Sequence, residues 1–167
     1  MLLIYENLKI RSAEAGDAEL LCNWWNDGQV MAHAGYPNGL GITVDQVQIN
    51  RGLFIMEVDH QPVGEMSCRK IAEATAELGI KICDFSQQNK GYGPIFLKML
   101  INHLFTELGV QKVVLDTNLN NVRAQATYEK IGFTKVRINH DAWQNQAGEM
   151  QSSVDYELLK SEFSWER

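Results

Sequence analysis

A glycine-containing segment at residues 88–94 is where the types and spacing of residues point most clearly to chemistry. An apolar run at 78–83 precedes it, and an apolar stripe with helical spacing follows at 95–105. This pattern predicts a strand, a glycine turn and the N-terminus of a helix. Free backbone N–H groups and the helix dipole attract anions there, and Gly91 and Gly93 let the backbone approach a phosphate closely.

The glycines alone leave two interpretations open, a tight turn that caps a helix and a phosphate-binding site. The sequence lacks the G-x-x-x-x-G-K-[ST] pattern of a P-loop and the third glycine of a dinucleotide-binding loop, so both of those classes are excluded. Pro94 is expected at the first position of the helix, where its missing N–H costs least.

A second segment, at 121–133, places an amide and a phenol on one face of a predicted helix. Asn121, Ala124 and Tyr128 are spaced i, i+3 and i+7, and Gly132 is expected to end the helix. A phenol with a pKa of about 10 is protonated at neutral pH and can donate a proton. The alternative for such a tyrosine is packing only.

Together, the two segments resemble the GNAT superfamily of acyl-CoA-dependent N-acyltransferases. Gln88-x-x-Gly91-x-Gly93 is similar to the pyrophosphate loop of that family, Q/R-x-x-G-x-G/A, and residues 121–133 are similar to its N-x-x-A-x-x-x-Y-E-K-x-G-F segment. The resemblance covers about residues 54–133. Toward both ends it is looser, and there it is to the ribosomal-protein and aminoglycoside 6′-N-acetyltransferase branches.

The resemblance implies acetyl-CoA as the acetyl donor, held by the glycine loop and by the strand that enters it. Backbone N–H groups of the loop would hold the pyrophosphate, while the strand would pair with the pantetheine amides. Pro94 departs from the Ser, Thr or basic residue usual in the family, which removes one donor. The implied cofactor-binding residues are Ile82, Cys83, Gln88, Asn89, Lys90, Gly91, Tyr92, Gly93 and Asn121.

The resemblance also implies the catalytic groups. Tyr128 is the candidate general acid, and the candidate general bases are Glu77, eleven residues before Gln88, and Asp116, five residues before Asn121. Each carboxylate has a solvated or structural role as its alternative, and a water chain without a side-chain base is a further one. We expect direct attack by a primary amine on acetyl-CoA in a ternary complex. The competing function is a non-catalytic acyl-CoA-binding sensor module.

The elements that must position these residues predict one α/β (α+β) domain over residues 1–167. Hydrophobic residues make up 45% and charged residues 22%, as in a soluble domain with one core. Strands are predicted at 8–11, 53–58, 63–69, 77–83, 113–115, 133–140 and 154–159, and helices from 17, 94 and 121. The resemblance implies a GNAT-like fold, with a mixed, mostly antiparallel sheet, splayed central strands and flanking helices.

The charge balance bears on partners. With 15 basic and 21 acidic residues the net charge is −6, which argues against nucleic acid or an anionic membrane as a partner and favours a cationic acceptor. An aminoglycoside, a polyamine and a protein N-terminus satisfy this equally. We expect Trp24, Trp25 and Tyr36 to wall the acceptor side, with the polar stretch at 145–153 at its other end.

The three cysteines, Cys22, Cys68 and Cys83, form no C-x-x-C pair and are expected to be reduced thiols.

The N-terminus has no basic segment before its short apolar run, so we expect neither a signal peptide nor a membrane span. The expected location is therefore the cytoplasm. The four histidines are scattered and no Cys/His cluster occurs, so no metal site is expected. The oligomeric state stays open between a monomer and a homodimer.

Overall fold

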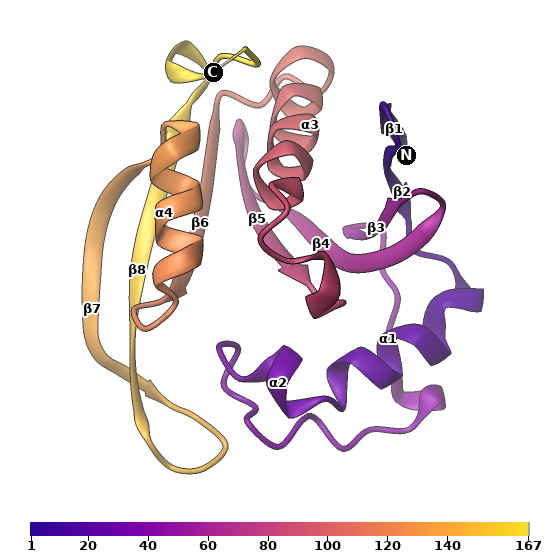
Figure 1. Cartoon of the computed structure of the whole chain (residues 1–167). Helices are drawn as coiled ribbons and strands as arrows, with labels where there is room; N and C mark the ends of the chain where they lie inside the picture. The colour runs from indigo at the N-terminus through magenta and orange to yellow at the C-terminus, as the bar shows by residue number, and fades with distance from the viewer. Residues whose placement is uncertain (167) are drawn as a thin grey trace.

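The chain forms eight strands that pair in one open sheet, and the computed structural model describes residues 1–166 (Figure 1). The strands are β1 (Leu2–Tyr5), β2 (Leu8–Ser12), β3 (Leu53–Val58), β4 (Gln61–Ala72), β5 (Thr75–Ile82), β6 (Lys112–Asn118), β7 (Thr134–Gln144) and β8 (Met150–Leu159). The α-helices are α1 (Ala18–Trp25), α2 (Gly28–Met31), α3 (Tyr92–Glu107) and α4 (Val122–Ile131). This α+β architecture confirms the expected fold class.

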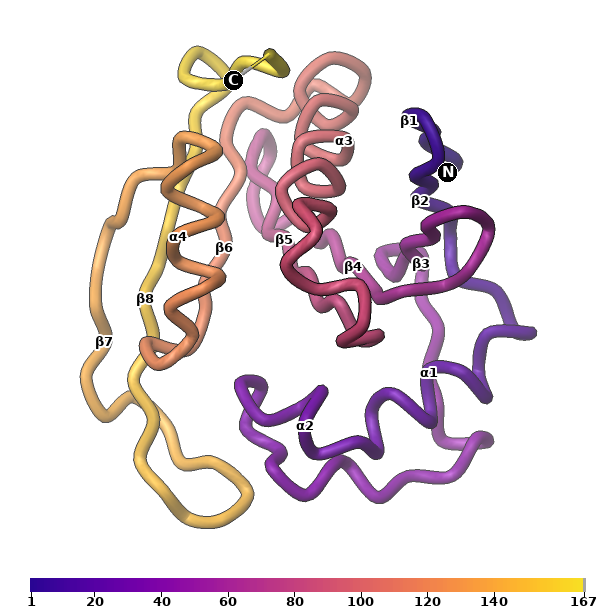
Figure 2. Tube along the Cα trace, in the orientation of Figure 1, coloured from indigo at the N-terminus to yellow at the C-terminus, as the bar shows by residue number. Residues whose placement is uncertain are grey.

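The strand order is β1-β2-β3-β4-β5-β6-β8-β7, and within residues 1–166 the only parallel pairing joins β5 to β6. That pairing ends at Glu77 and Val114, although β5 continues to Ile82 and β6 to Asn118. The two central strands therefore diverge, as expected. Figures 1 and 2 show the gap that results, with α3 on one side of it and α4 on the other.

Helices pack on both faces of the sheet, so the molecule has three layers. Along β3 every residue is buried, because Phe54 and Met56 join the main core under α3 while Leu53 and Ile55 pack with Leu21 of α1. Since neighbouring side chains on a strand point to opposite faces, α1 covers the face opposite to α3. In the described chain, no helix combines the length and apolar character needed to cross a bilayer.

Several element boundaries differ from those expected. An N-terminal strand that the sequence did not predict, β1, pairs with β2, and β8 begins at Met150 and lies between β6 and β7. Helix α3 begins two residues early, at Tyr92 with Gly91 as its N-cap, so Pro94 is third rather than first in the helix. The polar stretch at 145–153 is a loop only over 145–149, because cross-strand bonds from β7 draw the rest into β8.

Candidate active site

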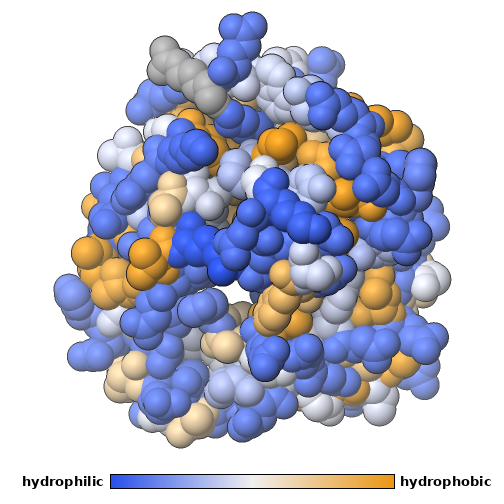
Figure 3. Space-filling model, viewed as in Figure 1, coloured by the Kyte–Doolittle hydropathy of each residue, from blue (hydrophilic) through white to orange (hydrophobic). Residues whose placement is uncertain are grey.

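The divergence of β5 and β6 opens a cavity of about 990 Å³. Its wall combines the end of β5, the glycine loop, the first turns of α3 and α4, the end of β6, and α2. Figure 3 shows the opening on the surface, with strongly hydrophilic side chains bridging it from the α4 side to the α3 side. Segments that are distant in the sequence are thus brought to one hollow.

The glycine loop presents a row of free donors at the α3 end of this cavity. Within the described chain, none of the five backbone N–H groups of residues 89–93 donates to a protein acceptor. Asn89 and Gly91 have φ of 62° and 82°, which turns successive N–H groups to one side. A Cβ on Gly91 or Gly93 would meet no atom within 4 Å. This nest, at the N-terminus of a 16-residue helix, fits a pyrophosphate.

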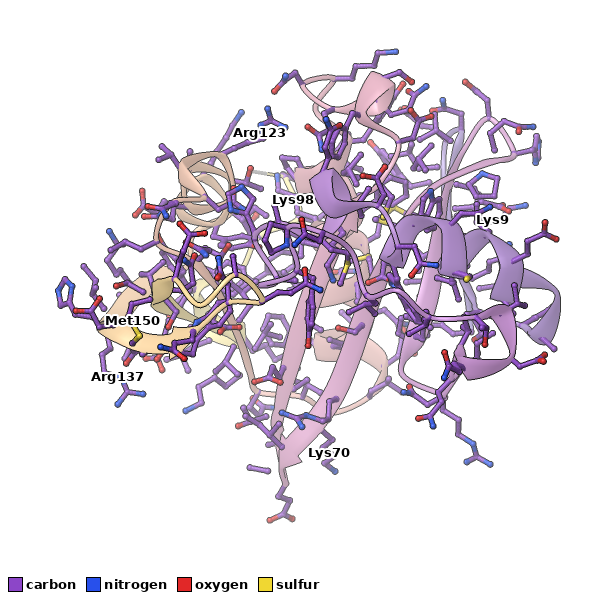
Figure 4. All side chains as sticks on the ribbon, turned by 90° about the horizontal axis from the view of Figure 1, so that it is seen from below. Lys9, Lys70, Lys98, Arg123, Arg137 and Met150 are labelled. Atoms are coloured by element: carbon purple, nitrogen blue, oxygen red, sulfur yellow. The ribbon has the colours of Figure 1, made fainter. Side chains whose placement is uncertain are left out.

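Gln88 connects the loop to both sides of the gap. Its Nε2 donates to the Ile82 carbonyl over 3.1 Å, and its Oε1 accepts from Nη1 of Arg123 on α4. Figure 4 shows Arg123 projecting from α4 toward the α3 side. The side chain of Gln88 therefore spans the gap, while Lys90 is exposed outside the cavity wall.

Of the two strand residues expected to pair with pantetheine, Ile82 lines the cavity and Cys83 does not. Ile82 lines the cavity, and its carbonyl is taken by Gln88. Cys83 is buried outside the wall, and its N–H donates to the Val63 carbonyl over 2.8 Å. Burial, with the negative charge of Glu65, raises the pKa of the Cys83 thiol to about 12, so it stays protonated at neutral pH.

Tyr128 lies on α4 and lines the cavity. The ring is 5% exposed and packs edge-on against Tyr156, with centroids 5.6 Å apart. In residues 1–166 the hydroxyl has no hydrogen-bond partner. Burial, and then the nearby charge of Asp116, raise the pKa of the phenol. Tyr128 therefore enters any reaction protonated.

Asp116 lies on β6 two residues beyond the last pairing with β5, and it lines the same cavity. Its side chain reaches solvent through the cavity, yet the surrounding protein desolvates it and raises its pKa, helped by the charges of Asp155 and Glu77. Asp155 is its direct neighbour on β8. Among the described residues no Lys, Arg or His nitrogen lies within 4 Å of Asp116.

Three other carboxylates near Asp116 on this face of the sheet each have a cationic partner. Glu65 is 3.1 Å from Lys81, Glu77 is 2.7 Å from Arg69, and Asp155 is 3.1 Å from Arg137. Glu77 lies at the closed end of the divergence and outside the cavity wall. The structure therefore brings Tyr128 and Asp116 to one cavity but leaves Glu77 beneath it.

Asn121 and α2 complete the wall. Asn121 caps α4 by accepting from the Ala124 N–H over 3.2 Å, and it also lines the cavity. From the opposite face of the sheet, α2 and its following turn contribute Gln29, Val30, His33 and Ala34.

The tryptophans expected at the acceptor wall are elsewhere. Trp24 and Trp25 pack against Leu21, Leu53 and Ile55, because the apolar face of α1 covers β3. The indole N–H of Trp25 donates to Glu65 over 2.7 Å. Tyr36 is exposed and outside the wall. The expectation that these aromatic side chains wall the acceptor side is therefore wrong.

Comparison with known proteins agrees with this geometry. Residues 7–134 match the family described as the acetyltransferase (GNAT) domain, and the chain belongs to that family. GNAT proteins move an acetyl group from acetyl-CoA to amines. The protein is therefore an acetyl-CoA-dependent N-acetyltransferase.

Individual relatives share the fold at low sequence identity. A curated, uncharacterised N-acetyltransferase, p20 of Bacillus licheniformis, is 22% identical over 97% of this chain and 98% of its own. A GNAT acetyltransferase from Bacillus anthracis superposes with a TM-score of 0.84 at 21% identity, over 97% and 100% of the two chains. The spermidine N-acetyltransferase of Vibrio cholerae, solved with CoA and spermine, superposes with a TM-score of 0.83 at 20% identity. The match covers 98% of this chain and 100% of that one.

Gly93→Glu tests the nest. Its φ is ordinary for a helix and its Cβ position is open, so the fold should survive, while a carboxylate beside the free N–H groups should repel a pyrophosphate. We expect the affinity for CoA in titration calorimetry to fall by at least about tenfold. Gly16→Glu, at an equally open position on the opposite side of the sheet, is the control. Equal CoA affinity in both variants would remove the nest from the phosphate site.

Proposed function

We propose that the protein acetylates a primary amine that is cationic before reaction, by direct attack on acetyl-CoA in a ternary complex. One observation carries the proposal: a single cavity joins an anion-binding nest, a protonated phenol and a carboxylate without a cationic partner. The first suits a pyrophosphate, the second a leaving thiolate, and the third an ammonium group. No two of these groups come from the same strand or helix, so the fold is what brings them together.

At the donor end of the cavity, the residues of this chain hold and orient acetyl-CoA. The nest supplies five N–H groups, and Asn121 lines the cavity at the start of α4. Acetyl-CoA supplies the activated carbonyl and a thiolate leaving group. Tyr128 holds a proton at its hydroxyl, for the sulfur that leaves when the C–S bond breaks.

At the acceptor end, we propose that Asp116 attracts the ammonium and takes its proton, directly or through one water. Its raised pKa makes it a better base than an ordinary aspartate. Glu77 is the second candidate, but it lies outside the cavity wall and is held by Arg69 over 2.7 Å. The net charge of −6 adds a long-range attraction for cations.

The acceptor class is supported, in part, by the relatives. One structural neighbour is a spermidine acetyltransferase. Another is RimL, a ribosomal L7/L12 α-N-protein acetyltransferase solved with CoA. RimL superposes with a TM-score of 0.84 at 15% identity, over 95% of this chain and 98% of its own. Both of those acceptors are amines. The three free thiols, Cys22, Cys68 and Cys83, fit a proposed cytoplasmic location.

A turnover screen tests the function as a whole. Thiol release from acetyl-CoA should be fastest with cationic amines, a polyamine, an aminoglycoside and a peptide N-terminus, and slower with an acidic amino acid or a phosphosugar amine. Because attraction between charges weakens with ionic strength, the KM for the cationic amine should rise with added salt. An anionic best substrate would contradict the charge argument.

Tyr128→Phe tests the proton donor, because it keeps the ring and removes only the hydroxyl. We expect kcat to fall by about 10²-fold or more with the KM for acetyl-CoA nearly unchanged. Tyr156→Phe, which loses a hydroxyl that bonds to Glu129, is the matched control and should lose far less activity. Wild-type turnover in Tyr128→Phe would exclude the phenol as the acid.

Asp116→Asn tests the base through pH. The wild-type kcat/KM should rise with pH as Asp116 deprotonates, above the range of an ordinary aspartate, and the variant should lose this acidic limb. Glu77→Gln is the comparison and should keep the limb. If Glu77→Gln loses it instead, the roles of the two carboxylates are exchanged.

A stability measurement on Asp116→Asn reports the same pKa without activity. A carboxyl whose pKa is higher in the folded than in the unfolded state costs stability above that pKa, and the cost fades as pH falls through it. The variant should therefore melt higher than wild type at neutral pH, with a difference that shrinks on acidification.

A further inference from the structure

A hydrogen-bonded bridge joins the end of β5 to α4, and the side chain of Gln88 forms its centre. At one end, Nε2 of Gln88 donates to the Ile82 carbonyl over 3.1 Å. At the other end, its Oε1 accepts from Nη1 of Arg123, which lies in the first turn of α4. All three residues line the cavity. The bridge therefore occupies part of the wall that a ligand in the gap would contact.

The carbonyl that Gln88 occupies is one that the divergence of the strands leaves without a partner. The next N–H along the chain, that of Cys83, donates to the Val63 carbonyl on the β4 side over 2.8 Å. Backbone groups of successive strand residues point to alternate sides, so those of Ile82 point to the gap. The pairing of β5 with β6 has already ended at Glu77. The amide of Gln88 thus replaces a missing strand, and a ligand amide lying along β5 would compete with it.

Arg123 is a cation of the cavity wall that no carboxylate neutralises. Lys81, which also lines the cavity, is 3.1 Å from Glu65. Within residues 1–166, no carboxylate oxygen lies within 4 Å of Arg123, and its hydrogen-bond partner is the neutral amide oxygen of Gln88. A guanidinium binds a phosphate more strongly than a neutral amide, because the bonds are charge-assisted on both sides and its fork fits two oxygens.

The position of this guanidinium relative to the nest gives it access to a phosphate. Gln88 directly precedes the free N–H groups of residues 89–93 in the chain. Through its bond to Gln88, the side chain of Arg123 therefore reaches from α4 to the edge of the anion-binding loop. A phosphate bound there would meet Arg123 if the Gln88 side chain moved away.

We propose that Arg123 is a phosphate-binding residue of the donor site, and that Gln88 competes with the donor for both of its bridge partners. CoA carries amides in its pantetheine arm and phosphates at its nucleotide end. When it binds, Ile82 exchanges the amide of Gln88 for an amide of the arm, and Arg123 exchanges it for a phosphate. The phosphate is the pyrophosphate or the 3′-phosphate. The inference concerns the donor end alone, so it does not depend on the acceptor proposed above.

Titration calorimetry with CoA tests the two roles, because their loss shifts the affinity in opposite directions. Gln88→Ala should bind CoA roughly two- to tenfold more tightly than wild type, since a competing hydrogen bond no longer has to be broken. Arg123→Ala should bind CoA at least about tenfold more weakly, the scale of a lost charge-assisted bond. Gln48→Ala and Arg51→Ala are the matched controls and should bind like wild type. Both positions are exposed and outside the cavity wall, and their side chains have no hydrogen bond within residues 1–166.

Two truncated ligands identify the group that Arg123 contacts. Pantetheine has the amides but no phosphate, so its affinity in a protein-detected NMR titration should rise in Gln88→Ala and should not fall in Arg123→Ala. Dephospho-CoA lacks only the 3′-phosphate. If Arg123 contacts the pyrophosphate, Arg123→Ala loses affinity for dephospho-CoA as well as for CoA. If it contacts the 3′-phosphate, only the affinity for CoA falls, and either result supports the inference.

Three results would overturn the inference. CoA binding by Gln88→Ala that is unchanged or weaker excludes the competition, and weaker binding in both variants gives the bridge a structural role only. CoA affinity in Arg123→Ala equal to that in Arg51→Ala excludes the phosphate contact. An equal loss of affinity for pantetheine and CoA in Arg123→Ala does the same. In each case, a wild type that binds CoA leaves the acetyltransferase function standing.

Discussion

The structure depends on an interruption in its own sheet. Two parallel strands pair over only three positions and then part, so that the backbone groups beyond Glu77 and Val114 lack the sheet partners they would otherwise have. The nest, Tyr128 and Asp116 all stand around that interruption. A continuous sheet would be the lower-energy arrangement of these strands alone, and the packing of α3 and α4 on one face keeps the two halves in place despite the gap.

The electrostatics follow from the same arrangement. On the acceptor face, neighbouring strands place opposite charges side by side, as in Glu65 with Lys81, and these pairs largely cancel. Beyond the last β5–β6 pairing no such neighbour from β5 stands beside Asp116, and its neighbour on the other side, Asp155, is itself acidic. Its charge is uncompensated because the gap removed one of the two strands that would have flanked it.

The sequence predicted best what is encoded locally. The glycine loop, the start of a helix at 121 and the end of α4 at Gly132 rest on residues close in the chain, and the structure has each of them. The start of α3 was misjudged, since Pro94 is tolerated anywhere in the first turn. The Arg123–Gln88 contact and the part of α2 in the wall were missed, because they join distant segments and leave no periodic signal. The tryptophans were misplaced because an aromatic residue on a helix has the same signature whether it faces a core or a cavity.

At the tip of the β7–β8 hairpin, the side chain of Gln146 bonds to Asn38 and Gly39, which lie 108 and 107 positions away, whereas the nest and the cap at Asn121 are built from neighbours. Closing so long a loop costs more chain entropy than forming a local turn. We therefore expect the contacts of the hairpin tip to form later in folding than the nest.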